Sequence, residues 1–139
     1  MQTKNYNYLS EDVRGIRQKV FMDEQGFQNE FDDIDSIATH IVMYNESNEP
    51  IATCRIFEGE EPGAYLLGRL AVLKEYRGCH IGSKMIEAAE KVITGKGGKS
   101  LSLHAQCRVR DFYMKSGFVE YGEEDEEEGC PHIWMKKQF

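Results

Sequence analysis

The first apolar pattern of the chain has the period of a helix. Within residues 10–22, the apolar positions share one helix face: Val13, Ile16, Val20 and Phe21. Ser10 precedes this pattern, and its hydroxyl can accept a hydrogen bond from an amide of the first turn. We therefore expect a helix that begins after Ser10 and ends before Gly26. The acidic segment 29–38 then reads as a loop with room for a short helix.

Strand patterns follow, with turn residues between them. Residues 39–44 ("THIVMY") and 50–57 ("PIATCRIF") read as two strands, and "NESNE" between them has the composition of a turn. These two strands should form a hairpin. The next run, residues 64–73 ("AYLLGRLAVL"), is apolar nearly throughout, which is typical of a central strand covered on both faces. Gly68 inside this run indicates a bulge.

The second half of the chain alternates between helix and strand. Residues 81–97 place apolar side chains on one helical stripe, with Glu and Lys opposite. The later patterns predict five further segments: strand 99–105, helix 108–117, strand 118–122, acidic loop 123–131 and strand 132–137. The strand–helix–strand unit in the middle implies a right-handed crossover, which makes its two strands parallel. We expect an α/β (α+β) fold, a mixed sheet with outer hairpins and helices on both faces.

Composition narrows the classes of function. The chain has 139 residues, the size of one domain, and a formal net charge of −7, which argues against a nucleic-acid partner. No apolar run approaches the ~20 residues of a membrane span, and the N-terminal stretch lacks the apolar core of a secretory signal. The four cysteines form no C-x-x-C pair, so neither a zinc site nor a redox motif is predicted. We expect a cytoplasmic protein with no metal and no membrane partner.

The stretch "YRGCHIG" (76–82) lies between the apolar strand and the amphipathic helix. The first amides of a helix have no partner within it, and the helix dipole makes that end positive. Small residues let an anion approach those amides, and Arg77 adds a charge that can bind a phosphate. A diphosphate site is one interpretation, and a tight connection without a ligand is the other. The motif is neither a Walker loop nor the dinucleotide G-x-G-x-x-G.

A wider resemblance favours the diphosphate site. The segments "GRLAVLKEYRGCHIGSKMIEAAE", "LSLHAQ" and "DFYMKSGF" resemble, in order and spacing, the GNAT superfamily of acyl-CoA-dependent N-acetyltransferases. The family signature [QR]-x-x-G-x-[GA] maps onto residues 77–82, where His80 stands at a position usually held by glycine. The segments "VFMDEQGF" and "GCPHIWM" further resemble the ElaA-type branch of the family.

The resemblance implies one GNAT domain over residues 1–139, with a mostly antiparallel mixed sheet whose central parallel strands splay apart. It implies an N-acetyltransferase that moves an acetyl group from acetyl-CoA directly to an amine of a small molecule or peptide. A GNAT fold that binds an acyl-CoA as a sensor or regulatory module, without efficient transfer, is the alternative. The acidic run 123–128 would border the acceptor site and either attract a cationic amine or only aid solubility. A homodimer is an arrangement that the resemblance leaves open.

The family motifs also imply a cofactor site. The pantetheine arm is expected along the strand before the loop and near Gln106, and the diphosphate at the loop amides. These positions are Leu70, Ala71, Val72, Arg77, Gly78, Cys79, His80, Ile81, Gly82, Ser83 and Gln106. The side chain of His80 either contacts a phosphate or faces solvent, and a positive φ would strain it more than glycine. Cys79 is either a reactive thiol beside Arg77 or an inert small residue.

Two residues are expected to carry the chemistry. Tyr113 in "FYMKSGF" matches the family tyrosine near the acetyl sulfur, a general acid for the departing thiolate, with an ordinary core tyrosine as the alternative. The attacking amine must lose a proton, and we favour Glu24 as the group that accepts it. His40, His104 and His132 are the other candidates, and each has a structural hydrogen-bonding role as its alternative.

Overall fold

The computed structural model describes residues 1–28, 30–127 and 129–139. Its strands, α-helices and shorter helical segments follow in this order: β1 (Gln2–Tyr6), α1 (Glu11–Arg17), the π-helix η1 (Gln18–Glu24), η2 (Asp33–Ser36), β2 (Thr39–Tyr44), β3 (Pro50–Glu58), β4 (Ala64–Val72), η3 (Lys74–Tyr76), α2 (Ile81–Gly95), β5 (Ser100–Gln106), η4 (Cys107–Val109), α3 (Arg110–Lys115), β6 (Val119–Glu127) and β7 (Cys130–Gln138). None of the helices in these ranges is long and apolar enough to cross a membrane.

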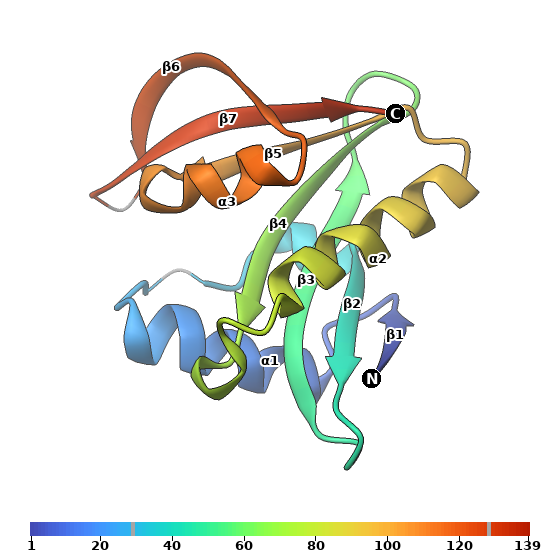
Figure 1. Ribbon diagram of the computed structural model, residues 1–139, viewed down its shortest axis with the longest axis vertical. Helices are drawn as coiled ribbons and strands as arrows, with labels where there is room; N and C mark the ends of the chain where they lie inside the picture. Colours follow the sequence, from blue (N-terminus) through green and yellow to red (C-terminus); the bar gives the residue numbers. More distant parts are fainter. Residues whose placement is uncertain (29, 128) are drawn as a thin grey trace.

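The strands form one sheet in the order β1–β2–β3–β4–β5–β7–β6 (Figure 1). β4 and β5 are parallel, and the other neighbouring strands are antiparallel. α2 makes the crossover between β4 and β5, as the strand–helix–strand pattern predicts. The expected mixed, mostly antiparallel sheet is confirmed.

β4 and β5 pair over only part of their length. The parallel register joins residues 64–67 to residues 100–103. Beyond it, β4 continues beside β3 and β5 beside β7, so the two strands splay apart (Figure 1). The expected bulge in β4 is present where Arg69 and Leu70 lie opposite the single residue Cys54 of β3, and Arg69 has a φ of 54°.

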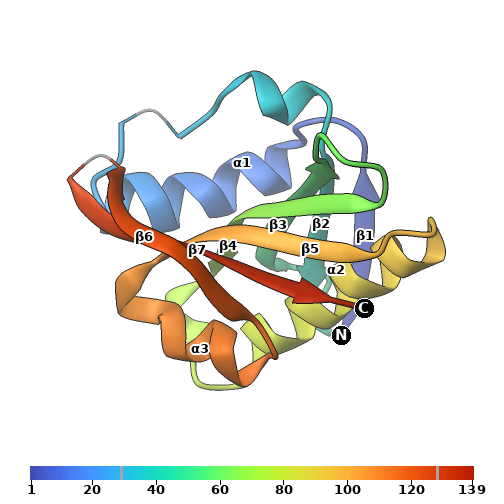
Figure 2. The same ribbon diagram turned by 90° about the horizontal axis from the view of Figure 1, so that it is seen from above.

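Helices cover both faces of the sheet, α1 on one face and α2 and α3 on the other (Figure 2). The α1 side has a core of Val13, Ile16, Val20, Phe21, Val42, Tyr44 and Ala71. The opposite core is larger and contains the buried stripe of α2: Ile81, Met85, Ile86, Ala89 and Ile93. Because side chains alternate along a strand, the central strands supply both cores.

The structure differs from the prediction at three elements. β1 was missed because its side chains are mostly exposed, so this edge strand has no apolar alternation. The helix over 10–22 begins with the predicted Ser10 cap but changes from α to π at Gln18. The acidic loop is wrong in part, since residues 123–127 belong to β6 and residues 125–127 pair with β7, whereas Glu128 lies outside the described residues. An exposed edge strand accommodates such charges.

The acidic segment 29–38 contains the short helix that was expected there, η2, and Asn29 lies outside the described residues. Oδ2 of Asp35 accepts a hydrogen bond from the backbone amide of Asp32 at 3.1 Å, and the backbone amide of Asp35 donates to the carbonyl of Asp32 at 3.2 Å, so the two residues close the first turn of this helix. The segment returns the chain from α1 to the sheet and places its carboxylates beside the central strands.

Candidate functional site

The splaying of β4 and β5 opens a cavity of about 1110 Å³. Its walls come from the bulged half of β4, the loop before α2, the end of β5 and α3. The structure brings most of the predicted cofactor residues to these walls: Leu70, Ala71, Val72, Arg77, Gly78, His80, Ile81, Gly82, Ser83 and Gln106. Cys79 is exposed in the same loop and is not one of the lining residues.

The β4 wall of the cavity has an open strand edge. Residues 71 and 72 pair with β3 on one side, and the described chain places no strand on their other side. Because backbone groups alternate between the two edges of a strand, some of those near residues 70–72 face the cavity without a ladder partner. An extended ligand can form hydrogen bonds with such an edge.

The far end of the cavity is the N-terminus of α2. His80 is the N-cap residue of this helix, and its side chain makes no capping hydrogen bond. The first amides of this 15-residue helix are therefore available to an anion. A Cβ at Gly82 would lie 2.9 Å from Cζ of Phe112, so α3 packs closely against this turn because residue 82 is glycine.

His80 has a backbone conformation typical of glycine, the residue usual at this position of the motif. Its φ is 61°, in the left-handed region that glycine adopts most readily. For a side chain such as histidine this conformation costs on the order of 1 kcal/mol. The His80 side chain is exposed and borders the cavity, and a contact with a phosphate stays a prediction.

Arg77 is oriented by two partners. Its Nε donates to the carbonyl of Val72 at 3.0 Å, and Nη1 and Nη2 each donate to one oxygen of Glu24 at 2.9 Å. These hydrogen bonds lower the pKa of Glu24, although partial burial opposes the shift. Glu24 is not one of the residues that line the cavity, whereas Arg77 is. The role of Glu24 as a base stays a prediction, and its observed contact is with the predicted phosphate ligand.

Tyr113 is a buried residue of α3 at the wall of the cavity. Its ring packs edge-on against Phe112 and Phe118, with ring centroids 5.0 and 6.0 Å away. Burial raises the pKa of its hydroxyl, so the phenol carries its proton at neutral pH. The ring is thus part of the core, and the residue also borders the cavity. The two roles that the sequence left open, a general acid and a core tyrosine, are therefore compatible.

Gln106 ends β5 and lines the cavity. Its Nε2 donates to Oε1 of Gln25 at 2.9 Å, and its Oε1 accepts from Nε of Arg108 at 2.7 Å. The amide therefore joins the end of η1 to β5, and contact with a pantetheine arm stays a prediction.

Known proteins share both the sequence pattern and this architecture. A family model described as "Acetyltransferase (GNAT) domain" matches residues 7–139. The chain belongs to the GNAT acetyltransferase family. A protein of Bacillus subtilis (strain 168), provisionally named an acetyltransferase, is 34% identical over 128 residues, which are 88% of this chain and 85% of that protein.

The chain is also similar to solved structures of acetyltransferases and of ElaA. A provisionally named N-acetyltransferase from Lactobacillus plantarum has a TM-score of 0.87 and 28% identity, with 99% of both chains covered. Escherichia coli ElaA has a TM-score of 0.83 and 26% identity, with 98% of both chains covered. An aminoglycoside 6'-N-acetyltransferase complexed with coenzyme A (TM-score 0.78, 14% identity, 99% and 97% covered) shares the fold. The predicted resemblance to GNAT proteins and to ElaA is confirmed.

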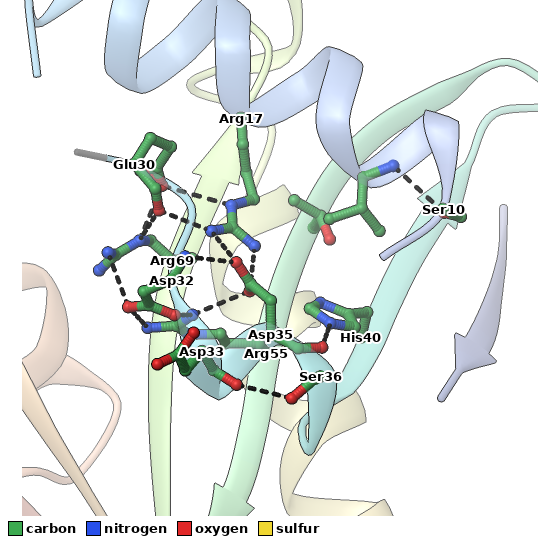
Figure 3. Close-up of polar contacts among 12 residues, drawn as sticks. Ser10, Arg17, Glu30, Asp32, Asp33, Asp35, Ser36, His40, Arg55 and Arg69 are labelled. Carbon is green, nitrogen blue, oxygen red and sulfur yellow. Dashed lines mark hydrogen bonds and ion pairs between the residues drawn. The ribbon is translucent and has the colours of Figure 1, made fainter. Parts of the chain in front are cut away.

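A buried charge network borders the cavity of this GNAT domain on its α1 side (Figure 3). Nη1 of Arg17 and Nη1 of Arg55 both donate to Oδ1 of Asp35, at 2.7 and 2.8 Å. Arg17 and Arg69 also form ion pairs with the same oxygen of Glu30, at 3.3 and 2.7 Å. Sequence reasoning missed this network, although an arginine within the apolar strand β3 was a signal for it.

The network changes the acidity of its members. Burial disfavours the charge of Asp35, but hydrogen bonds from Arg17 and Arg55 outweigh it and lower its pKa to about 2. Burial is the dominant effect at Glu30 and raises the pKa of that carboxyl despite Arg69 and Arg17. His40 donates from Nε2 to the carbonyl of Asp35 at 3.0 Å, and its burial lowers its pKa. His40 is thus engaged in a structural hydrogen bond.

Proposed function

We propose that this GNAT protein is an acetyl-CoA-dependent N-acetyltransferase that moves an acetyl group directly to an amine. The observation that carries the proposal is the cavity between the splayed strands, which has an open strand edge on one wall and uncapped helix amides at its end. A long cosubstrate would match these two features if it carried an amide-containing arm for the strand edge and a diphosphate for the helix amides. Coenzyme A has this chemistry, and the aminoglycoside acetyltransferase of the same fold is complexed with it.

Acetyl-CoA would lie along the cavity in a single orientation, with its diphosphate at the N-terminus of α2. Its pantetheine arm would form hydrogen bonds with the free backbone groups near residues 70–72, and its diphosphate would meet the amides of residues 78–83. Arg77, held by Glu24, would present its guanidinium to the phosphates. In this arrangement the thioester lies beyond the α2 N-terminus, toward the point where β4 and β5 separate.

The chemistry requires one proton donor and one proton acceptor. The amine nitrogen attacks the thioester carbonyl, a C–N bond forms and the C–S bond breaks, and the thiolate takes the proton of Tyr113. The raised pKa of Tyr113 keeps its hydroxyl protonated at neutral pH but makes it a weaker acid. Glu24 is the predicted acceptor of the amine proton, but the hydrogen bonds from Arg77 lower its pKa and weaken it as a base.

Two measurements test the proposal against the sensor alternative. Acetyl-CoA at about 1 mM should raise the melting temperature, because a ligand that binds only the folded state stabilises it. CoA release should then appear with one member of a panel of aminosugars, polyamines, small amines and peptides. Stabilisation without release across the panel favours the acyl-CoA sensor, and absence of both effects refutes cosubstrate binding altogether.

Tyr113→Phe tests the acid role. The variant should lower kcat about 100-fold with an accepted amine, because general acid catalysis contributes on that order, and should leave acetyl-CoA binding unchanged. Tyr65→Phe is the matched control, since Tyr65 has the same 8% exposure but lies outside the cavity. Equal kcat in the two variants would assign Tyr113 to the core alone.

A further inference from the structure

Three side chains with metal-ligand chemistry meet on the α1-side face of the sheet, at the wall of the cavity. His104 comes from β5, His132 from β7 and Glu127 from the end of β6, and all three line the cavity. The two imidazole rings lie 4.7 Å apart, and Trp134 stacks on His104 at 4.8 Å. We call these three residues the His–Glu–His cluster.

The second nitrogen of each ring is held by an acceptor outside the cluster. Nε2 of His104 lies 2.6 Å from Oδ1 of Asp125, and Nδ1 of His132 lies 2.7 Å from the carbonyl oxygen of Cys130. A carboxylate and a carbonyl only accept, so Nε2 of His104 and Nδ1 of His132 each carry a hydrogen. In the neutral rings, the lone pairs are therefore on Nδ1 of His104 and Nε2 of His132.

Both lone pairs face the same carboxylate oxygen. Oε2 of Glu127 lies 3.5 Å from Nδ1 of His104 and 3.5 Å from Nε2 of His132. Both separations exceed the usual hydrogen-bond range of about 2.7–3.2 Å. With both rings neutral, three electron-pair donors converge with no hydrogen between them, and a shared cation would remove their mutual repulsion.

We propose that the His–Glu–His cluster binds one divalent metal ion of borderline softness, with Zn²⁺ as the representative. Ligands at about 2.1 Å from a tetrahedral centre lie about 3.4 Å from one another, close to the two 3.5 Å separations. The candidate ligand atoms all lie within 4.8 Å of one another, so small side-chain rotations complete the geometry. Two imidazoles and one carboxylate suit zinc and similar ions better than calcium or magnesium.

The surroundings of the cluster also match a metal site. Histidine ligands of metals usually donate their second N–H to a carboxylate or a backbone carbonyl, as His104 and His132 do to Asp125 and Cys130. The His132 residue is buried at 4% exposure, whereas the Glu127 side chain is about half exposed and has room to rotate. Three protein ligands leave a fourth position, and the cavity supplies room for a water or a ligand there. The site is additional to acetyl transfer and does not depend on it.

Cobalt and zinc titrations of the whole protein test the site. Co²⁺ added to chelator-treated protein should give the visible absorption of a tetrahedral centre, saturating at one equivalent, and Zn²⁺ should displace it. Glu127→Gln and His132→Ala should each weaken Zn²⁺ binding at least tenfold. Asp125→Asn should weaken it by about 10- to 100-fold through the orientation of His104.

A matched control separates the site from surface charge. Glu126→Gln removes the same charge from the adjacent position of β6. This variant should bind Zn²⁺ as the unmodified protein does. The proposal is overturned by absence of one-equivalent binding, by equal loss in the ligand variants and the control, or by imidazole NMR spectra that keep both ring nitrogens protonated at saturating Zn²⁺. The melting-temperature shift with acetyl-CoA, measured on the same samples, reports the proposed function separately.

Discussion

Two groups of ionisable side chains border the same cavity, and they differ in how completely they are paired. In the network of Arg17, Arg55 and Asp35, with their partners, each guanidinium meets at least one carboxylate within 3.4 Å (Figure 3). In the His–Glu–His cluster, the same kind of carboxylate meets two nitrogens only at 3.5 Å. The first group pairs each carboxylate with a guanidinium, although Nε of Arg55 has no hydrogen-bond partner among the described residues, and the second leaves donor atoms directed at a common point.

The difference follows from burial. Arg17 and Asp35 are 1% and 4% exposed, so any charge left unpaired there would carry a large desolvation penalty. The side chains of Glu127 and Asp125 are about half exposed, and water can solvate them without a protein partner. The paired, buried network therefore stabilises the fold, whereas the donor atoms of the His–Glu–His cluster on the cavity wall can bind a ligand. Each prediction below tests one side of this contrast.

The largest effect is expected at the centre of the closed network. Asp35→Asn leaves Arg17 and Arg55 without their shared carboxylate and should lower the unfolding free energy by about 3–5 kcal/mol. Asp33→Asn is the control, because Asp33 lies in the same η2 turn but is exposed, and it should change stability by less than about 0.5 kcal/mol. Urea unfolding measures both. Similar losses in the two variants would show that the network is not what stabilises this region.

Acid should weaken the same network by a smaller amount. The folded-state pKa of Asp35 is lowered from 3.8 to about 2, so its stabilisation is fully present above pH 3.8 and is lost as pH falls through 2. The shift corresponds to about 2 kcal/mol. Glu30 acts in the opposite sense, because its raised pKa makes the ionised form unfavourable and acid relieves that cost.

The comparison of wild type with Asp35→Asn isolates the Asp35 contribution. Their difference in unfolding free energy should narrow by about 2 kcal/mol between about pH 5 and about pH 2. Titration of the Asp35 carboxyl by NMR should give its pKa directly. A difference that stays constant with pH would place the Asp35 pKa at its ordinary value and contradict the strong hydrogen bonds.

The smallest effect is expected at the open cluster. In the presence of a chelator, Glu127→Gln should change the unfolding free energy by less than about 0.5 kcal/mol, because this exposed carboxylate makes no close hydrogen bond with either histidine. The same urea experiment measures it. A loss close to that of Asp35→Asn would mean that both groups are structural, and the contrast between them would fail.

The local patterns of the sequence predicted most of the elements correctly. The amphipathic stripe of α2, the apolar run of β4 and the Ser10 cap each depend on residues close together in the chain. β1 escaped prediction because its stability comes from pairing with β2, which leaves no periodic apolar signal. The acidic end of β6 looked like a loop because its strand conformation is imposed by β7.

In the candidate site, too, residues in local motifs were predicted, and contacts between distant residues were not. The loop from Arg77 to Gly82 and Tyr113 were found because they lie in contiguous motifs, and the structure brings them to one cavity. The contact of Glu24 with Arg77 joins residues 53 positions apart, and local sequence contains no signal for it. The absence of a metal was predicted from cysteine spacing, a rule that does not detect histidine and carboxylate ligands from separate strands.

From the sequence we predicted the order of the central elements, the GNAT motifs and an anion site at the N-terminus of α2, because each prediction depends on residues close together in the chain. Which ionisable side chains pair with one another, and which keep donor atoms without a close partner, follows from the tertiary structure. The sheet order places β7 between β5 and β6, and this arrangement brings His104, Glu127 and His132 together. The return of the chain through η2 sets Asp35 between Arg17 and Arg55. Both outcomes depend on pairing between distant segments, which only the folded chain provides.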